Sequence, residues 1–423
     1  MYSFTYGASM RGSASIPTQR LNFCWNTYFK DTSAGEPDLR MLSPMTSLTA
    51  RPLDGQGESR RLSKAGPLEK SWFQPYEPIP LLRGGHAQTL AGNYWRRSPF
   101  AVPFESVAVE VDPSDGSRVL CHCHWQPQAV RADRLTILLV HGLEGSSDSR
   151  YIRGITTRAW AMGCNVIRMN MRNCGGTESW TPTLYHSGLS RDVFAVLEHF
   201  VRLFALRRVA IAGYSMGGNL VLKLAGELGE HAPEWLLASV GVSPAMDLAA
   251  SADALHDPSN RMYEWHFLRN LMRRFQRKVR LYPEIYSFAG LGPIRTIREF
   301  DDRITARYNG FTGADDYYFQ AASARVVSRI SIPSLVMHAM DDPFIRLLPE
   351  TRSKLVANAA VELIETAHGG HCAFLAKTVT SASQTVNLSS PDGLEASSEE
   401  ARHWAEATLV RFLMATAGHA DGS

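Results

Sequence analysis

From Leu135 onward, short apolar runs alternate with longer amphipathic segments, and this alternation constrains the fold more than any other feature of the sequence. Parallel strands need long crossover connections, usually helices, so the pattern predicts an α/β fold with a mostly parallel sheet covered by helices on both faces. The expected strands are Leu135–Val140, Asn165–Met169, Arg208–Ala212, Leu237–Val242, Ser334–Met337 and Val361–Glu365. The expected helices lie near Tyr151–Ala161, Ser190–Leu206, Asn219–Glu227 and Ala401–Ala415.

Upstream, two runs with alternating apolar residues, Val107–Val111 and Val119–Trp125, flank Asp115-Gly116, and this arrangement predicts a β-hairpin. The second run contains Cys121-His122-Cys123-His124, which has the composition of a metal site. In a strand, however, the two thiols point to one face and the two imidazoles to the other. One ion cannot collect all four ligands, so we expect no metal site here.

The chain has 423 residues, yet an α/β fold often exceeds about 250 residues as one unit, so we expect one folded domain over residues 71–423. Residues 1–70 are polar and rich in Ser, Gly and Pro, and they are expected to form an unpacked leader. A transit peptide and a misassigned start upstream of Met41 or Met45 both fit this leader. Within the domain we expect a helical cap at about 247–329, over the carboxyl edge of the sheet, and a flexible loop at 378–399.

Charge and cysteine usage narrow the class of protein. The leader carries the whole formal net charge of +3 and residues 71–423 are neutral overall, so no basic field for nucleic-acid binding remains on the domain. The longest nearly uninterrupted apolar run, Leu135–Val140, is far shorter than the ~20 residues of a membrane span. Six scattered cysteines fit reduced thiols better than a disulfide framework. We therefore expect a soluble, cytoplasmic protein with no nucleic-acid ligand and no obligate protein partner.

Gly213-Tyr214-Ser215-Met216-Gly217 has the form G-x-S-x-G and lies between an expected strand and an expected helix. In that context the motif forms a nucleophile elbow, a turn so sharp that it needs glycine two positions to either side of the serine. The N-terminus of the following helix supplies free N–H groups and a favourable dipole for developing negative charge. A glycine-rich turn that contains serine by chance is the alternative, but the flanking strand and helix favour a catalytic Ser215.

A serine nucleophile needs a base, and the base needs an orienting carboxylate. In folds with this elbow the three follow in the chain order Ser, acid, His. Asp341 and Asp342 follow the fifth expected parallel strand, and His368 and His371 follow the last one. Both groups are therefore expected at the carboxyl edge of the sheet, beside Ser215.

The same edge is predicted to form an oxyanion hole from two backbone N–H groups. One belongs to Met216, directly after the nucleophile, and the other to Leu143, in the glycine-flanked loop His141–Gly145. His141 is a further candidate base, but no acid is evidently paired with it. The order Ser, acid, His favours a loop-structuring role for His141.

With these motifs the sequence resembles the YheT-like α/β-hydrolases, a family of serine esterases with lipid-acting animal relatives. The matching motifs are Gly85–Leu90, His141–Gly145, Arg172–Gly176, Tyr185–Gly188, Gly213–Gly218, Arg298–Asp302, Asp341–Phe344 and His368–His371. The resemblance places the triad on Ser215, Asp342 and His371, and Asp341 is then expected to accept backbone N–H groups and shape its turn. Two departures lie outside the triad: Gly84-Gly85 replaces the usual Asn-Pro, and Asn173 the usual Gly.

The resemblance implies hydrolysis of small-molecule carboxylic esters, including acylglycerols and other lipid esters. The reaction passes through an acyl-enzyme and needs no metal ion or organic cofactor. Two alternatives remain open: an acyltransferase with the same triad, and a catalytically silent hydrolase fold that acts as a binding scaffold.

One cap segment has apolar residues at helical spacing with basic residues between and opposite them. The apolar residues are Trp265, Leu268, Met272, Phe275, Val279 and Tyr282, and the basic ones are Arg269, Arg273, Arg274, Arg277, Lys278 and Arg280. In one interpretation the apolar stripe packs on the sheet domain and the basic face is solvated. In the other, the cap contacts an anionic membrane surface peripherally and presents lipid esters to the site.

Overall fold

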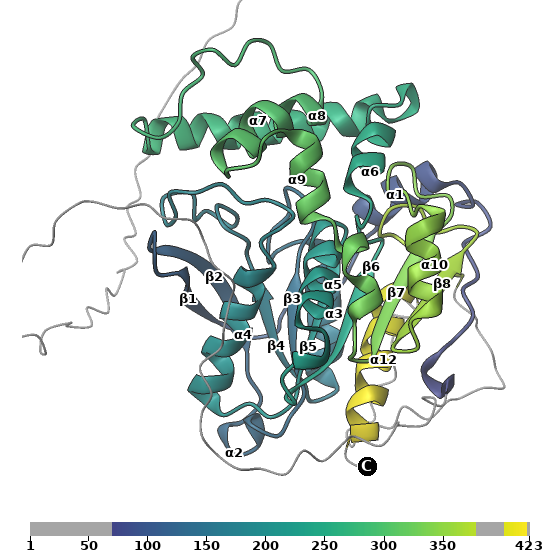
Figure 1. The fold of residues 1–423 in the computed structure, drawn as a ribbon. Helices are drawn as coiled ribbons and strands as arrows, with labels where there is room; N and C mark the ends of the chain where they lie inside the picture. The colour runs from purple at the N-terminus through teal and green to yellow at the C-terminus, as the bar shows by residue number, and fades with distance from the viewer. Residues whose placement is uncertain (1–69, 378–401, 421–423) are drawn as a thin grey trace, which may run out of the picture. The chain divides into compact units, whose positions relative to one another are not determined.

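The structure is a computed structural model that describes residues 70–377 and 402–420 (Figure 1). The expected leader, apart from Lys70, and the expected loop at 378–399 lie outside the described residues.

One eight-stranded sheet forms the centre of the domain, in the strand order β1-β2-β4-β3-β5-β6-β7-β8. The strands are β1 (Glu105–Asp112), β2 (Ser117–His124), β3 (Thr136–Val140), β4 (Asn165–Met169), β5 (Val209–Tyr214), β6 (Leu236–Val242), β7 (Ser334–Ala339) and β8 (Val361–Thr366). β1 pairs with β2 and β2 with β4 in antiparallel fashion, and the other pairs are parallel. The predicted α/β class, the hairpin and the six parallel strands are confirmed, with strand ends displaced by at most two residues.

Helices cover both faces of this sheet (Figure 1). On one face lie α3 (Arg150–Ala161) and α12 (Trp404–Ala420), and on the other lie α4 (Ser190–Phe204) and α5 (Met216–Leu228). Alternate residues of the parallel strands feed the two resulting cores, with Leu138 facing α4 and α5 and Ile137 facing α3 and α12. Every residue of β3 is buried, which is why this strand reads as a continuous apolar run.

Three further helices were not expected from the sequence. They are α1 (Gly85–Tyr94), α2 (Gln128–Arg131) and α10 (Pro349–Ala357). α1 and α10 bury few side chains on one face, so neither produces a clear apolar period. Short 3₁₀ turns lie at Lys70–Trp72, Gly229–His231, Pro258–Asn260, Ser323–Arg325 and Val327–Arg329.

The segment between β6 and β7 forms a helical layer beyond the carboxyl edge of the sheet, drawn at the top of Figure 1. Its elements are α6 (Leu248–Leu255), α7 (Arg261–Leu281), α8 (Ile297–Phe300), the π-helix η4 (Asp301–Ala306) and α9 (Ala314–Ala321). We refer to this layer as the cap. None of the described helices is long and apolar enough to span a bilayer.

In helix α7, the side chains that are buried and those that are exposed differ from the ones expected from the sequence. Leu271 and Phe275 are buried, but Trp265 is 59% exposed and lies beneath Arg269 on the outer face. Arg274 and Lys278 are buried on the inner face instead of being solvated. The expectation that all the basic residues of α7 face solvent is therefore wrong at these two positions, because both side chains bind oxygen acceptors of the sheet domain.

In β2 the side chains of Cys121-His122-Cys123-His124 alternate as expected. Both thiols enter the core between the sheet and α4. His122 shares a hydrogen bond of 3.1 Å with the Ser147 hydroxyl, and His124 accepts one of 2.9 Å from Arg168 Nε. The imidazoles therefore bind polar groups of the domain itself.

Candidate active site

Ser215 lies at the turn from β5 into α5, and its backbone is strained. Its φ and ψ angles are 54° and −118°, a region that non-glycine residues rarely occupy. A Cβ atom on Gly213 would lie 2.1 Å from the Gly217 carbonyl oxygen, and one on Gly217 would lie 2.3 Å from the Val140 carbonyl oxygen. Both glycines are therefore required by the packing of the elbow, and the elbow predicted from the sequence has the expected backbone.

Asp342 and His371 approach from the loops after β7 and β8. His371 Nδ1 and Asp342 Oδ2 are 2.9 Å apart, and the Asp342 side chain is fully buried. The other carboxylate oxygen accepts the N–H groups of Phe344, at 3.1 Å, and Ile345, at 2.9 Å. These bonds fix the carboxylate so that it holds the imidazole by one nitrogen.

The neighbouring pair Asp341 and His368 has a looser geometry. His368 Nδ1 lies 3.4 Å from Asp341 Oδ2, and His368 is partly exposed. Asp341 Oδ1 accepts the N–H of Gly370 at 2.8 Å, in agreement with the role expected for this residue. Asp341 thus connects the loop after β7 to the loop that carries His371.

The other ring nitrogen of His371 faces Cys372. Its Nε2 lies 3.5 Å from Cys372 Sγ, and within the described residues the Ser215 hydroxyl makes no hydrogen bond. Catalytic hydrogen bonds are often long or unformed before substrate binds, so the unformed bond between Ser215 and His371 does not argue against the pair. Burial disfavours the imidazolium, but Cys372 and Asp342 outweigh burial and hold the pKa of His371 above its ordinary value.

Helix α1, which the sequence pattern did not predict, supports both loops. The Thr89 hydroxyl accepts the His371 N–H at 2.8 Å, and Gln88 accepts the Leu375 N–H at 2.9 Å. A Cβ atom on Gly85 would lie 1.7 Å from the Asp341 carbonyl oxygen, so the first turn of α1 packs directly on the acid loop. The motif Gly85–Leu90 therefore positions the candidate base and acid from behind.

The loop after β3 brings Leu143 to the same site. Leu143 and Met216 both line the pocket at Ser215. The N–H of Leu143 donates to no acceptor among the described residues, and Met216 opens α5, where an N–H has no partner within the helix. These two amides have the availability that an oxyanion hole requires.

Two tyrosines and an ion pair hold this loop. The Gly142 N–H donates to the Tyr151 hydroxyl at 2.8 Å, and the Tyr185 hydroxyl donates to Glu144 at 2.6 Å. Glu144 also binds Arg274 of the cap helix α7, with 2.9 Å between Nε and Oε1. The cap is thus attached to the loop that carries Leu143, a connection that only the folded chain reveals.

His141 is fully buried and pairs with no carboxylate among residues 70–377 and 402–420. It contacts the Gly142 carbonyl oxygen at 2.8 Å through Nδ1 and accepts the Met171 N–H through Nε2 at 3.2 Å. Burial lowers its pKa to about 4, so the ring is neutral at physiological pH. These contacts agree with the loop-structuring role expected from the sequence.

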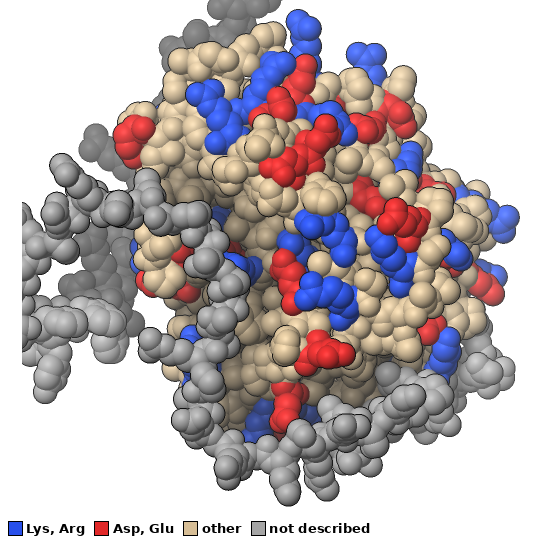
Figure 2. Space-filling view, viewed as in Figure 1, with Lys and Arg blue, Asp and Glu red and all other residues tan. Residues whose placement is uncertain are grey.

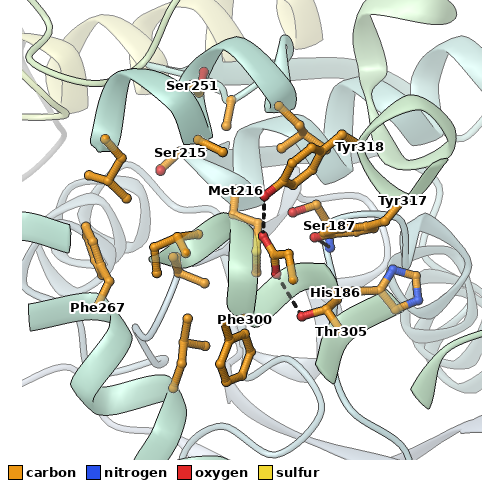
Figure 3. Close-up of a pocket in the computed structure, with 18 of the residues that line it drawn as sticks. His186, Ser187, Ser215, Met216, Ser251, Phe267, Phe300, Thr305, Tyr317 and Tyr318 are labelled. Atoms are coloured by element: carbon orange, nitrogen blue, oxygen red, sulfur yellow. Dashed lines mark hydrogen bonds between the residues drawn. The ribbon is translucent and has the colours of Figure 1, made fainter. Parts of the chain in front are cut away.

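A largely apolar pocket extends from Ser215 beneath the cap (Figure 3). It encloses about 970 Å³ of space free of protein atoms, part of it open to solvent. Its apolar lining includes Leu143, Leu248, Phe267, Leu271, Phe300 and Phe344. Sheet domain and cap contribute to the wall together, so the cap helps to determine which molecules can reach Ser215.

Comparisons with known proteins agree with this arrangement. Residues 136–378 match the family model described as the alpha/beta hydrolase fold. The YheT protein of Escherichia coli (strain K12) is 33% identical over 314 residues, which cover 73% of this chain and 89% of that protein. The chain belongs to the YheT-like α/β-hydrolases.

Two further relatives of this α/β-hydrolase carry lipid-hydrolase names. Phospholipase ABHD3 of Mus musculus is 32% identical over 57% of this chain and 59% of its own length. Monoacylglycerol lipase of Saccharomyces cerevisiae is 29% identical over 56% of this chain and 54% of its own length. The chain is thus related to hydrolases of the esterase and lipase type.

One departure from the family pattern has a structural explanation. Asn173 has a φ of 64°, in the left-handed region that glycine favours and asparagine tolerates. Its Nδ2 donates to the Thr183 carbonyl oxygen at 2.9 Å, which holds the turn. Asparagine can therefore occupy this left-handed position, where the resemblance leads us to expect glycine.

Proposed function

We propose that this α/β-hydrolase cleaves carboxylic esters through an acyl-enzyme. Ser215 is the nucleophile, His371 the general base and acid, and Asp342 the orienting acid. The N–H groups of Leu143 and Met216 form the oxyanion hole. The observation that carries the proposal is the 2.9 Å contact between His371 and Asp342 beside a strained serine elbow.

In the proposed mechanism, Ser215 Oγ attacks the ester carbonyl carbon while His371 Nε2 takes the hydroxyl proton. The carbonyl oxygen becomes an oxyanion between the two N–H groups. Collapse of this intermediate breaks the bond to the alcohol oxygen, which leaves with the proton from His371. Water then attacks the acyl-enzyme, gives its proton to His371, and releases the acid as the proton returns to Ser215. No step uses a metal ion or an organic cofactor.

The substrate class that we propose is lipid esters, including acylglycerols. The apolar lining of the pocket supports this choice, because an acyl chain there would replace contact with water by contact with side chains such as Phe267 and Phe300. The names of the mammalian phospholipase and the yeast lipase point to the same class.

A fluorophosphonate probe tests the nucleophile. The serine oxygen displaces fluoride from phosphorus, so the wild type should gain a covalent label at Ser215, and Ser215→Ala should not. Ser215→Ala should also lower kcat for ester hydrolysis by ~10³-fold or more. Ser251→Ala is the matched control, since Ser251 lines the same pocket but lies outside the elbow.

The same experiment separates the alternatives. A silent scaffold would not be labelled at Ser215, and near wild-type ester turnover by pure Ser215→Ala would contradict the assignment. An acyltransferase would be labelled, but added alcohol acceptors would divert the acyl group from water, and a new ester would form in proportion to acceptor concentration.

A further inference from the structure

The apolar pocket includes one carboxylate that the proposed mechanism does not use. Asp301 is the first residue of the π-helix η4 in the cap, and it lines the pocket together with Ser215. It belongs to the sequence motif Arg298–Asp302, which contributes no residue to the proposed triad or oxyanion hole. Its position in the pocket raises the question of what it binds there.

Two hydroxyl groups hold the Asp301 carboxylate. The Thr305 hydroxyl donates to Oδ1 at 2.7 Å, and the Tyr318 hydroxyl donates to Oδ2 at 2.8 Å; both bonds are drawn as dashed lines in Figure 3. An ionised carboxylate can accept about four hydrogen bonds, so about two acceptor positions remain. Asp301 is only half-buried and lines the pocket. A molecule bound there can therefore donate hydrogen bonds to these free acceptor positions.

Within the described residues, Asp301 has no ion-pair partner. Arg298 of the same motif lies over the Tyr318 ring, but it binds Asp253 at 2.8 Å and Asp315 at 2.5 Å and forms no ion pair with Asp301. The arginine that lines the pocket, Arg274, is bound to Glu144. Burial raises the pKa of Asp301 to about 6, and the hydrogen bonds from Thr305 and Tyr318 and the charge of Arg298 oppose this shift. Because the pKa stays raised, these groups offset only part of the cost of a carboxylate in this largely apolar wall, and a donor on a bound substrate would offset more of it.

The backbone around Asp301 is also unusual. Residues Asp301–Ala306 form a π-helix, a rare geometry that occurs most often at functional sites. Asp302, the next residue, is exposed and accepts the Ala314 N–H at 3.1 Å outside the pocket. Of two adjacent carboxylates, the local backbone therefore presents only Asp301 to the pocket.

We propose that Asp301 determines specificity by accepting a hydrogen bond from a hydroxyl or ammonium group on the ester substrate. The inference rests on the proposed ester hydrolysis at Ser215 and specifies its substrate. Substrates that carry such a donor on the part that enters the pocket are favoured over those with a methyl group there. Substrates with a carboxylate or phosphate at that place are disfavoured, because two negative charges would meet in an apolar surrounding.

Two series of straight-chain esters of varied length test the proposal. In one series the far end of the acyl chain is a methyl, a hydroxyl, an ammonium or a carboxylate group, with para-nitrophenol as the common leaving group. In the other, the same end groups are on the alcohol. At the chain length that reaches Asp301, kcat/KM should favour the hydroxyl or ammonium ester over the carboxylate ester by about 10- to 100-fold, the range of a charged hydrogen bond.

Asp301→Asn should remove most of this discrimination. The amide can still exchange hydrogen bonds with the hydroxyls of Thr305 and Tyr318, so the pocket wall should persist, and kcat/KM for the methyl-terminated ester should stay within about 3-fold of wild type. That ester is thus the internal control for folding. Tyr318→Phe keeps the charge and should keep the discrimination, and so should Asp302→Asn, the matched change outside the pocket.

The outcomes are distinguishable. Equal kcat/KM for all four end groups in both series, or a preference that survives intact in Asp301→Asn, would overturn the role of Asp301 while ester hydrolysis stands. If the hydroxyl ester is favoured and the ammonium ester is not, the ligand is an uncharged donor; the reverse result identifies a cation. No hydrolysis of any ester and no probe label at Ser215 would contradict the proposed function itself.

Discussion

The two nitrogens of the His371 ring face different partners. Nδ1 contacts Asp342 at 2.9 Å, and Nε2 lies 3.5 Å from Cys372 Sγ. The proposed mechanism needs Nε2 to be unprotonated when it takes the proton of Ser215. Whatever stabilises the imidazolium therefore lowers the fraction of active enzyme at a given pH.

This arrangement predicts the pH dependence of the reaction. Because the pKa of His371 is raised, the neutral base accumulates only at higher pH, and kcat/KM should rise with pH through a value above the ordinary histidine pKa. Cys372→Ala should move this limb to lower pH and keep the plateau, since Asp342 still orients the ring. Asp342→Asn should move it in the same direction but lower the plateau as well. A limb that does not move in Cys372→Ala would contradict the contribution of Cys372.

The two Asp–His pairs make a second prediction at this scale. Asp342→Asn should lower kcat by roughly 10²- to 10⁴-fold, because loss of the orienting carboxylate leaves the imidazole in the wrong tautomer. His371→Gln should abolish turnover. Asp341→Asn and His368→Gln are the matched controls and should retain substantial activity, with some loss where they support the loops. Circular dichroism verifies folding of each variant, and an inactive, folded Asp341→Asn would show that the acid is one residue earlier.

Sequence reasoning could select these candidate residues because their motifs are local. An elbow is specified by five consecutive residues, and the candidate acid and base follow recognisable strands. The residues that hold the site loops were not predictable. Thr89 binds the His371 N–H and Arg274 binds Glu144 only because the fold brings distant segments together. Asp301 belonged to a recognised motif, but its place in the pocket depends on how the cap packs.

At the scale of elements, the parallel strands were predictable because burial on both faces makes them continuous apolar runs. The helix α1 was not predictable, because it packs on loops and lacks an apolar stripe. In α7 the period was recognised but its orientation was not. Arg274 and Lys278 were assigned to solvent from their charge, whereas acceptors in the sheet domain make their burial possible.

Arg172 connects three elements, so replacing it should lower the stability of the domain strongly. It follows β4 and binds Asp192 in α4 through two hydrogen bonds of 2.6 and 2.7 Å, and it lies 3.6 Å from both Asp112 and Asp115 at the β1–β2 turn. Arg172→Gln leaves the buried carboxylate of Asp192 without its cation, which should lower the free energy of unfolding by about 3–5 kcal/mol. Urea denaturation measures this change.

Arg207→Gln is the control for Arg172, since it removes an ion pair of similar length to Asp133 whose side chains are 70% and 62% exposed. Exposed pairs of this kind contribute about 0–1 kcal/mol. Equal midpoints and slopes for the two variants would show that the buried network does not hold the hairpin and α4 together.

At the scale of the molecule, the cap has two faces. Its inner face forms the pocket at Ser215 together with the sheet domain, and its outer face is exposed on α7. The outer face of α7 carries exposed basic residues around Trp265. They are Arg261, Arg269, Arg273 and Arg280, whereas Arg277, which is also exposed, binds Glu178 at 2.8 Å. On the face seen in Figure 2, basic and acidic side chains are interspersed, over the cap as well as below it. The exposed arginines of α7, which we call the α7 row, thus lie on a domain with little net charge.

This row gives the last prediction, that the cap contacts anionic membranes peripherally. Each exposed arginine near an anionic bilayer contributes about 1 kcal/mol, and Trp265 can insert at the interface. The protein should therefore co-sediment with vesicles of phosphatidylcholine and phosphatidylserine more than with phosphatidylcholine alone. Arg269→Gln combined with Arg273→Gln should weaken this binding by about 30-fold. The same charge change on α4, Arg191→Gln with Arg202→Gln, should have little effect. Equal binding to both vesicle types, or none, would mean that the basic face of α7 is simply solvated.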